Sequence, residues 1–274
     1  MMDKALLVVS FGTSFKETRE KTICALENDL KEAFPDRNFY RAWTSNRIIK
    51  KVKETEGLDV YTIDEAINQM KEDGIKDLLV QPTHMMYGYE NARLAKLLEE
   101  KKTDFERIAV GLPMLMSDED IDFMSEAVMS EYEEVKAGEA ALVLMGHGSP
   151  GGPDKTVKTP DDDPNKVYRN QEESFHRLGY DKVFVGTVEA VPTVEDVIAE
   201  LKEAFPAPGK VYLAPYLIVA GDHATNDMAG DAPDSWKNLI AAEGYEAIPV
   251  IKGLGEYPEV RKRFVEHARE AKEI

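Results

Sequence analysis

The chain has 274 residues, of which 43% are hydrophobic, enough for one large domain or for two domains of about 130 residues each. Its formal net charge is −18, because 52 Asp and Glu residues outnumber 34 Lys and Arg residues. A field of that sign repels nucleic acids and anionic membrane surfaces, so neither is an expected partner. No apolar run approaches the roughly 18 to 20 residues that a membrane-spanning helix needs.

The first apolar run, at residues 5–11, predicts a core strand and not a secretory signal. It follows Asp3 and Lys4, and Gly12 and Thr13 break it without a small-residue cleavage site. The single cysteine, Cys24, excludes an internal disulfide and fits a reducing compartment. Both features predict a cytoplasmic protein, and the sequence leaves open whether it forms a homo-oligomer.

Short apolar runs alternate with amphipathic segments along the chain, which predicts parallel sheets with helices on both faces. Strands are expected at 5–11, 38–43, 77–83, 107–112, 140–146, 182–188, 210–218 and 246–250. Helices are expected near 16–33, 46–55, 63–73, 90–102, 118–136, 165–178, 194–204, 233–243 and 257–271. The predicted fold class is therefore α/β, with two similar three-layer domains at 1–137 and 138–274. The last helix is a candidate to pack back across that boundary.

The two halves also resemble each other in sequence, as an internal duplication would. The segment from Leu6 to Thr13 aligns with Leu142 to Ser149, and the segment from Leu79 to Glu90 aligns with Tyr212 to His223. In this overlay Phe11, Ser45 and Glu90 take the places of His147, Glu189 and His223. The metal-binding residue types therefore belong mainly to the second half.

Three polar residues each come just past an apolar run: His147 in ALVLMGHGS, Glu189 in KVFVGTVEA and His223 in KVYLAPYLIVAGDH. Alone, His147 could cap a turn and Glu189 could be an ordinary surface acid. The carboxyl ends of parallel strands converge on one crevice, however, so the three side chains are expected to meet. Two imidazoles and a carboxylate predict a divalent-metal site.

Neighbouring residues extend this prediction. One of Asp222, Asn226 and Asp227 is expected to hold one ring nitrogen of His223 and leave the other for the metal. His84, in QPTHMMYGYE, also ends a strand and is expected to line the same cleft.

An anionic ligand would need local positive charge in so acidic a chain. The segment RAWTSNRIIKKVK supplies Arg41, Arg47, Lys50, Lys51 and Lys53. Arg41 is the better pocket candidate because it lies near the end of a predicted strand, whereas the lysines are expected on a solvated helix face.

Five segments together resemble the class II tetrapyrrole chelatases: VVSFGTS, RAWTS, MGHGS, GTVEAVPTVEDV and YLIVAGDHATNDMAGDAPDSWK. The nearest branch is the anaerobic cobalt chelatase of early cobalamin synthesis, and the resemblance runs from residue 4 to about residue 267. It implies two similar α/β domains with an active-site cleft between them. The implied activity is insertion of Co²⁺ into sirohydrochlorin, without ATP and without a tightly bound cofactor.

The resemblance also implies residue roles. His147, Glu189 and His223 match the metal-contacting positions, His147 matches the proton acceptor, and Glu90 matches an acidic residue facing the cleft. The segment before Glu90 departs from the family, since it reads HMMYGYE where HIINGxE is frequent. Arg41 and the backbone N–H groups of Ser10, Phe11 and Gly12 are candidate clamps for the substrate's carboxylates.

Other functions remain open at this point. The same ligand types accept Fe²⁺ and Ni²⁺, so an iron- or nickel-inserting chelatase is an alternative. A non-catalytic metal or tetrapyrrole carrier would need the cleft but no proton acceptor. A metal-assisted hydrolase is disfavoured because the chain has neither a GxSxG nor an HExxH motif. The polar stretch 150–167 could be a lid over the site or an exposed loop.

Overall fold

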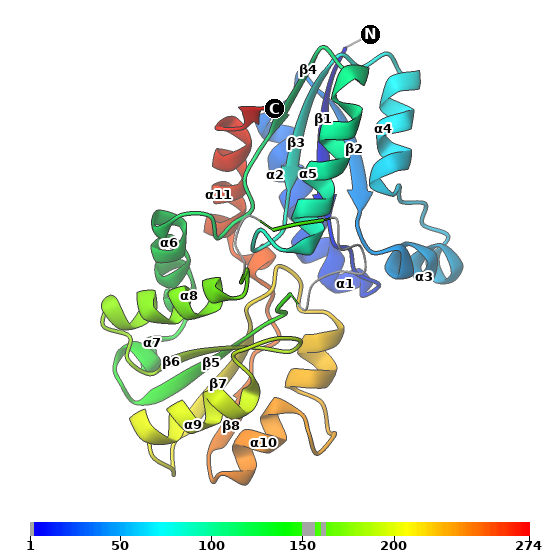
Figure 1. Ribbon diagram of the computed structural model, residues 1–274. Coiled ribbons are helices and arrows are strands. Elements are labelled where there is room, and N and C mark those ends of the chain that lie inside the picture. Colours follow the sequence, from blue (N-terminus) through cyan, green and yellow to red (C-terminus); the bar gives the residue numbers. More distant parts are fainter. Residues whose placement is uncertain (1–2, 150–156, 160–162) are drawn as a thin grey trace. The chain divides into compact units, whose positions relative to one another are not determined.

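A computed structural model describes residues 3–149, 157–159 and 163–274; the candidate lid at 150–167 lies in large part outside these residues. The described chain forms two α/β units, each built around its own sheet (Figure 1). The first unit runs to Met116 and also takes up Pro258–Ile274, and the second comprises most of Ser117–Tyr257. Within the described ranges, no helix combines the length and apolar character needed to cross a membrane.

The first unit contains a five-stranded sheet in the order β2-β1-β3-β4-β9, in which only β9 is antiparallel to its neighbour. Its strands are β1 (Lys4–Ser10), β2 (Asn38–Trp43), β3 (Asp77–Pro82), β4 (Arg107–Val110) and β9 (Lys272–Glu273). Its helices are α1 (Lys16–Arg19), η1 (Glu20–Cys24), α2 (Ala25–Ala33), α3 (Asn46–Glu56), α4 (Ile63–Glu72), α5 (Tyr89–Lys101), η2 (Lys102–Asp104) and α11 (Pro258–Arg269).

The strands of this sheet are continuous apolar runs because helices cover both of its faces. Alternate residues of β1, such as Leu7, pack with Met70 of α4 and Leu98 of α5 in one core cluster. On the other face α11 packs against α2 and β3 (Figure 1). The unit is therefore a three-layer sandwich.

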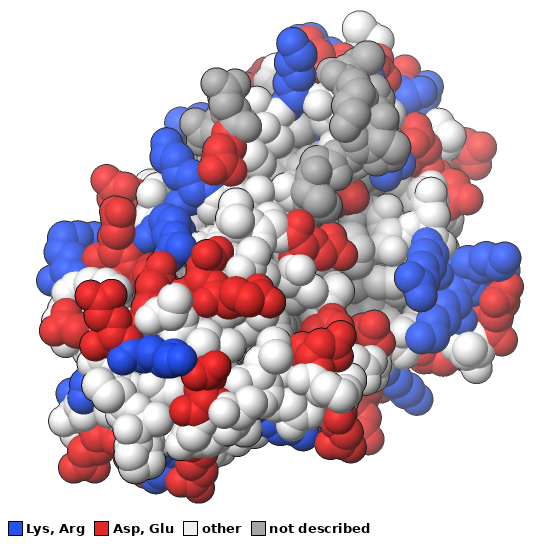
Figure 2. Space-filling view, turned by 60° about the horizontal axis from the view of Figure 1, so that its bottom comes forward, with Lys and Arg blue, Asp and Glu red and all other residues white. Residues whose placement is uncertain are grey.

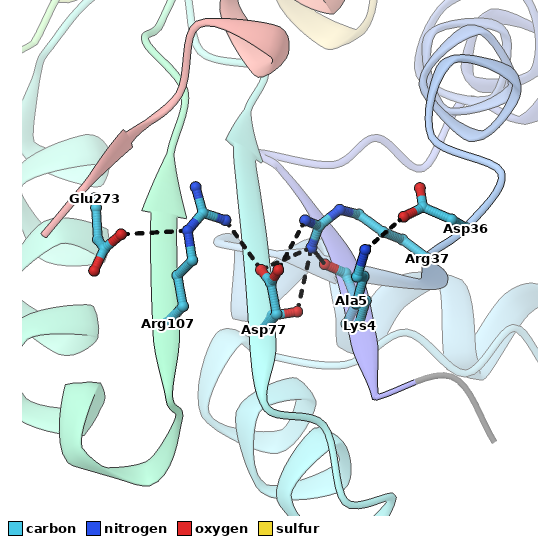
Figure 3. A network of polar contacts seen from close by, with 7 residues as sticks. All are labelled: Lys4, Ala5, Asp36, Arg37, Asp77, Arg107 and Glu273. Atoms are coloured by element: carbon cyan, nitrogen blue, oxygen red, sulfur yellow. Dashed lines mark hydrogen bonds and ion pairs between the residues drawn. The ribbon is translucent and has the colours of Figure 1, made fainter.

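An ion-pair network ties the amino ends of this sheet together (Figure 3). The carboxylate of Asp77, the first residue of β3, accepts from Arg37 at 3.0 Å and from Arg107 at 3.1 Å. Arg107 also pairs with Glu273 of β9 at 3.3 Å. These arginines hold the pKa of the Asp77 carboxyl below its usual range, although burial opposes them. The network lies at the edge opposite the carboxyl ends of the strands, so we assign it a stabilising role.

The second unit contains a four-stranded, fully parallel sheet in the order β6-β5-β7-β8. Its strands are β5 (Ala140–Gly146), β6 (Val183–Thr187), β7 (Lys210–Pro215) and β8 (Glu246–Pro249). Its helices are α6 (Asp118–Met129), α7 (Glu133–Lys136), α8 (Lys166–Arg177), α9 (Val194–Ala204), η3 (His223–Met228), α10 (Trp236–Ala242) and η4 (Leu254–Glu256). Val143 of β5, Val197 of α9 and Ile240 of α10 share one core cluster, while α8 packs on β6 beneath α6.

The strand registers confirm the similarity of the two halves. The order β2-β1-β3-β4 recurs as β6-β5-β7-β8. Leu6 pairs with Leu79 in the first sheet, and Leu142 pairs with Tyr212 in the second. These are the pairs that the sequence overlay equates, so the predicted class of two similar α/β domains is confirmed.

The division between the units differs from the boundary expected at 137/138. Helices α6 and α7 belong to the second unit because α6 packs on α8 and α7 on β5. The last helix, α11, belongs to the first unit, where it packs on α2 and leads into β9. Several expected elements are also shorter or broken: strand 107–112 ends at Val110, strand 210–218 ends at Pro215, a π-helical turn, η1, interrupts helix 16–33, and helix 118–136 is divided into α6 and α7.

Candidate metal centre

His147 lies on the first turn after β5, between two glycines that the packing requires. A Cβ atom on Gly146 would lie 2.3 Å from a ring carbon of Tyr168. Gly148 has φ +83°, and a Cβ there would lie 2.8 Å from that of Ala190. Only glycine combines this left-handed backbone with so close an approach, so the local sequence GHG fixes the path of the loop.

Side chains near and on α8 hold the same loop in place. The Tyr168 hydroxyl, fully buried, accepts a hydrogen bond from the Gly148 N–H at 3.1 Å. The Asn165 side chain accepts from the Ser149 N–H at 2.7 Å and donates to the Ser149 carbonyl at 2.9 Å. His147 is therefore carried on a backbone segment whose polar groups are largely fixed.

Glu189 is joined to this loop through the backbone. Beyond β6, its N–H donates to the His147 carbonyl at 2.9 Å, and the Val188 N–H donates to the Gly146 carbonyl at 3.0 Å. The Glu189 side chain is 42% exposed, so its carboxylate keeps part of its hydration.

His223 opens η3, the π-helical turn that follows the chain beyond β7. Such turns are rare and occur frequently at functional sites. Asp227, on the same turn, places Oδ2 2.5 Å from His223 Nδ1. Asp222 instead accepts from the Asn226 side chain at 3.0 Å. Of the three residues expected to hold a ring nitrogen of His223, the structure thus selects Asp227.

These three side chains come together at one edge of the second sheet. His147, Glu189 and His223 each offer a ligand atom, and the three atoms lie within 4.8 Å of one another. The His147 and His223 rings meet edge to face with centroids 4.8 Å apart, and His147 Nδ1 lies 3.8 Å from a Glu189 oxygen. All three side chains are partly exposed. A metal ion held here would keep coordination positions open for exchange.

The hydrogen bonds also identify the nitrogen atoms able to bind a metal. His147 Nδ1 lies 2.9 Å from the Gly148 carbonyl oxygen, and His223 Nδ1 lies 2.5 Å from the Asp227 carboxylate. Both partners only accept hydrogen bonds, so each Nδ1 carries the proton. The lone pair of each neutral ring is therefore on Nε2.

The first unit carries different residues at the equivalent edge. Gly12, which has φ +95°, packs on the Trp43 ring after β1, and Phe11 beside it is 43% exposed. The Ser10 hydroxyl is buried and accepts from Thr83 at 2.9 Å. Glu90 lies in the first turn of α5. This edge thus offers backbone, aromatic and carboxylate groups in place of the second unit's histidines.

His84, also in the first unit, follows β3. Burial lowers the pKa of its ring to about 4, so the ring is neutral at physiological pH. Among the described residues neither of its nitrogens has a hydrogen-bond partner. A neutral imidazole with unused donor and acceptor capacity suits contact with a ligand's polar groups better than charge pairing.

Arg41 does not fulfil the expectation of a free cationic clamp. It lies within β2, paired in register with Val8, and two further residues separate it from the end of the strand. Its Nε donates to the buried Glu27 carboxylate at 2.7 Å, and a second, shorter contact joins the same two groups. Its charge is therefore neutralised within the unit.

Tyr168 and Asn165 were not predicted from the sequence as supports of the site. No sequence signal identifies them, because their contacts with the GHG loop depend on how α8 packs against the sheet.

The fold and the site define an α/β protein in which three side chains at the carboxyl edge of the second sheet could hold a divalent metal ion. Comparison with known proteins supplies the family. The sequence model of the cobalt chelatase (CbiK) family matches residues 4–273. The chain therefore belongs to that family.

Two curated relatives are similar over nearly the whole chain. The sirohydrochlorin cobaltochelatase of Salmonella typhimurium is 35% identical over 272 residues, covering 98% of this chain and 97% of that protein. The sirohydrochlorin cobaltochelatase CbiKC of Nitratidesulfovibrio vulgaris is 27% identical over 263 residues, covering 94% of this chain and 86% of that protein.

Among solved structures, SirB from Bacillus subtilis with Fe³⁺ matches with a TM-score of 0.62 over 97% of this chain and 94% of that one. At 16% sequence identity this likeness shows the fold alone.

Proposed function

We propose that this chain is a chelatase that inserts Co²⁺ into sirohydrochlorin, without ATP, for anaerobic cobalamin synthesis. The family and both curated relatives support the metal and the tetrapyrrole. The observation that carries the proposal is the exposed group of His147, Glu189 and His223, whose ligand atoms lie within 4.8 Å of one another.

The donor set suits delivery of a metal rather than its storage. Structural metal sites are closed by four protein ligands, whereas here the described residues offer three, all partly exposed. Imidazole and carboxylate bind Co²⁺ without the very tight hold of a thiolate set. The ion can therefore be bound from solution and passed on to another set of nitrogen donors.

Insertion also releases protons, since a free-base tetrapyrrole loses two pyrrole N–H protons as the metal enters. Neutral imidazole accepts a proton near neutral pH because its reference pKa is about 6.5. His147 has its Nδ1–H donated to the Gly148 carbonyl, so Nε2 is the basic atom. We propose His147 as the proton acceptor, with Glu189 and His223 retaining the cation.

The first unit is proposed to contact the tetrapyrrole. Candidate contacts are the backbone from Ser10 to Gly12, the exposed Phe11 ring, the neutral His84 and the Glu90 carboxylate. Arg41 is left out because Glu27 takes up its charge. We keep the cytoplasm as the proposed location, which fits a chain whose one cysteine, Cys24, is free.

Anaerobic absorption spectroscopy tests the proposal. Sirohydrochlorin in excess over the protein is mixed in turn with Co²⁺, Fe²⁺ and Ni²⁺, and the spectral change is compared with a protein-free mixture. Multiple turnovers with Co²⁺, faster than the background, are expected.

Each other result has a definite meaning. If turnover were faster with Fe²⁺ or Ni²⁺ than with Co²⁺, the proposed metal substrate would be that ion instead of cobalt. Binding of one tetrapyrrole per chain without accelerated insertion of any of the three ions would make the protein a carrier.

A further inference from the structure

The tightest polar contact in the metal centre joins His223 to a residue that is not itself among the three ligands. Asp227 Oδ2 lies 2.5 Å from His223 Nδ1, four residues along the π-helical turn η3. A carboxylate only accepts hydrogen bonds, so the proton of the neutral ring is held on Nδ1. His223 Nε2 is consequently the ligand atom.

The two histidines of the centre differ in the groups that lie next to their Nδ1 atoms. His147 Nδ1 lies 2.9 Å from a neutral backbone carbonyl and 3.8 Å from a Glu189 oxygen, whereas His223 Nδ1 lies 2.5 Å from the Asp227 carboxylate. Hydrogen bonds with one ionised partner are shorter and roughly twice as strong as neutral ones. A carboxylate partner fixes the orientation of a ligating imidazole and raises its basicity toward the metal.

We infer that Asp227 is a positioning residue that orients His223 as an anchoring ligand of the centre. This role rests on the proposed function, because a chelatase must hold its cation before it passes it on.

The chain supplies a matched control on the same turn. Asp222 precedes His223 and its side chain accepts from Asn226 Nδ2 at 3.0 Å. Asp222→Asn and Asp227→Asn each remove one negative charge beside the centre, but only the second changes the partner of His223. Asp227→Ala removes the hydrogen-bond acceptor altogether.

The first readout is the tautomer of His223 in the metal-free protein, from ¹⁵N correlation spectra of the imidazoles. The proton is expected on Nδ1 in the wild type, in Asp222→Asn and in Asp227→Asn, whose amide oxygen can still accept. In Asp227→Ala it should move to Nε2. The second readout is Co²⁺ affinity, from the absorption of the protein-bound ion.

Asp227→Ala should weaken Co²⁺ binding about 10- to 100-fold, the range for loss of such a partner. Asp222→Asn should weaken it by no more than about two- to fivefold, as for an exposed charge. Equal weakening by Asp222→Asn and Asp227→Ala, or an unchanged tautomer in Asp227→Ala, would overturn the inference. Neither readout needs turnover, so the inference can fail while the chelatase activity stands, and the reverse also holds.

Discussion

The imidazoles of His147 and His223 meet edge to face, with ring centroids 4.8 Å apart and planes inclined at 85°. The two rings come from different elements, the turn after β5 and the π-helical turn η3, and each has its own Nδ1 partner. Each ring is thus held in place by a contact of its own. Preorganisation of this kind lowers the cost of binding a cation and sets where it is presented.

Tyr168→Phe should loosen the loop that carries His147. The change removes the hydroxyl that accepts from the Gly148 N–H at 3.1 Å and leaves that buried donor without this acceptor. We expect a loss of about 1–3 kcal/mol in unfolding free energy, together with weaker Co²⁺ binding. Urea unfolding and a cobalt titration measure the two effects.

Tyr40→Phe is the matched control for that change. It removes a hydroxyl that donates to Asp73 at 2.5 Å in the first unit. It should leave Co²⁺ affinity unchanged. If Tyr168→Phe bound Co²⁺ as tightly as Tyr40→Phe does, the support assigned to Tyr168 would be wrong.

Glu172 should make stability depend on pH. Burial raises the pKa of its carboxyl to about 7, although the Val185 N–H donates to it at 2.6 Å and opposes the shift. Because the folded-state pKa lies above the unfolded value, the folded protein binds the proton more tightly. The free energy of unfolding therefore falls as pH rises from about 4.5 to 7. Above pH 7 the buried carboxyl is ionised, and the whole of this loss in stability is present.

Glu172→Gln removes this cost and keeps an oxygen to accept from Val185. The variant should gain about 1–2 kcal/mol over the wild type at pH 8 and little at pH 4.5. Urea unfolding at the two pH values gives the comparison. A difference of the same size at both would refute the assignment.

The exposed cations of α3 should speed capture of the polyanionic tetrapyrrole. Figure 2 shows acidic side chains over much of one face, with Lys and Arg side chains gathered at the left and at the right of the view. On α3, Arg47, Lys50 and Lys51 are exposed at helical spacing on one face. Complementary charge raises association rates, and salt suppresses the effect.

Arg47→Gln combined with Lys51→Gln should therefore lower kcat/KM about three- to tenfold at low salt and have little effect at high salt. Lys262→Gln combined with Lys272→Gln changes the net charge equally and serves as the control. An equal loss in both double variants would mean that total charge, not the α3 face, matters.

The strands were predicted closely because a parallel sheet covered on both faces leaves uninterrupted apolar runs in the sequence. All eight predicted strands start within one residue of the observed strand. The two-residue strand β9 was missed, since so short a segment has no periodicity. The observed division differs from the boundary expected at 137/138 because α6 packs in the second unit, whereas the last helix, α11, packs back into the first unit as expected.

The meeting of His147, Glu189 and His223 could be predicted because parallel topology brings strand ends together, whatever their separation in sequence. Arg41 could not be judged from its position alone: its partner, Glu27, lies 14 residues earlier on α2. Likewise, the choice of Asp227 over Asp222 depends on the π-helical turn, which the sequence did not indicate. The roles of such side chains depend on contacts in the folded structure, which the sequence pattern does not contain.

The most direct test of the centre is a comparison of wild type with His147→Ala in anaerobic cobalt insertion, with tetrapyrrole binding followed separately. The account predicts that the variant still binds sirohydrochlorin, seen as a change in the absorption of the tetrapyrrole. It also predicts that the variant no longer forms the cobalt complex faster than the protein-free mixture does. Undiminished turnover by His147→Ala would contradict the assignment of this histidine, and with it the proposed site of metal insertion.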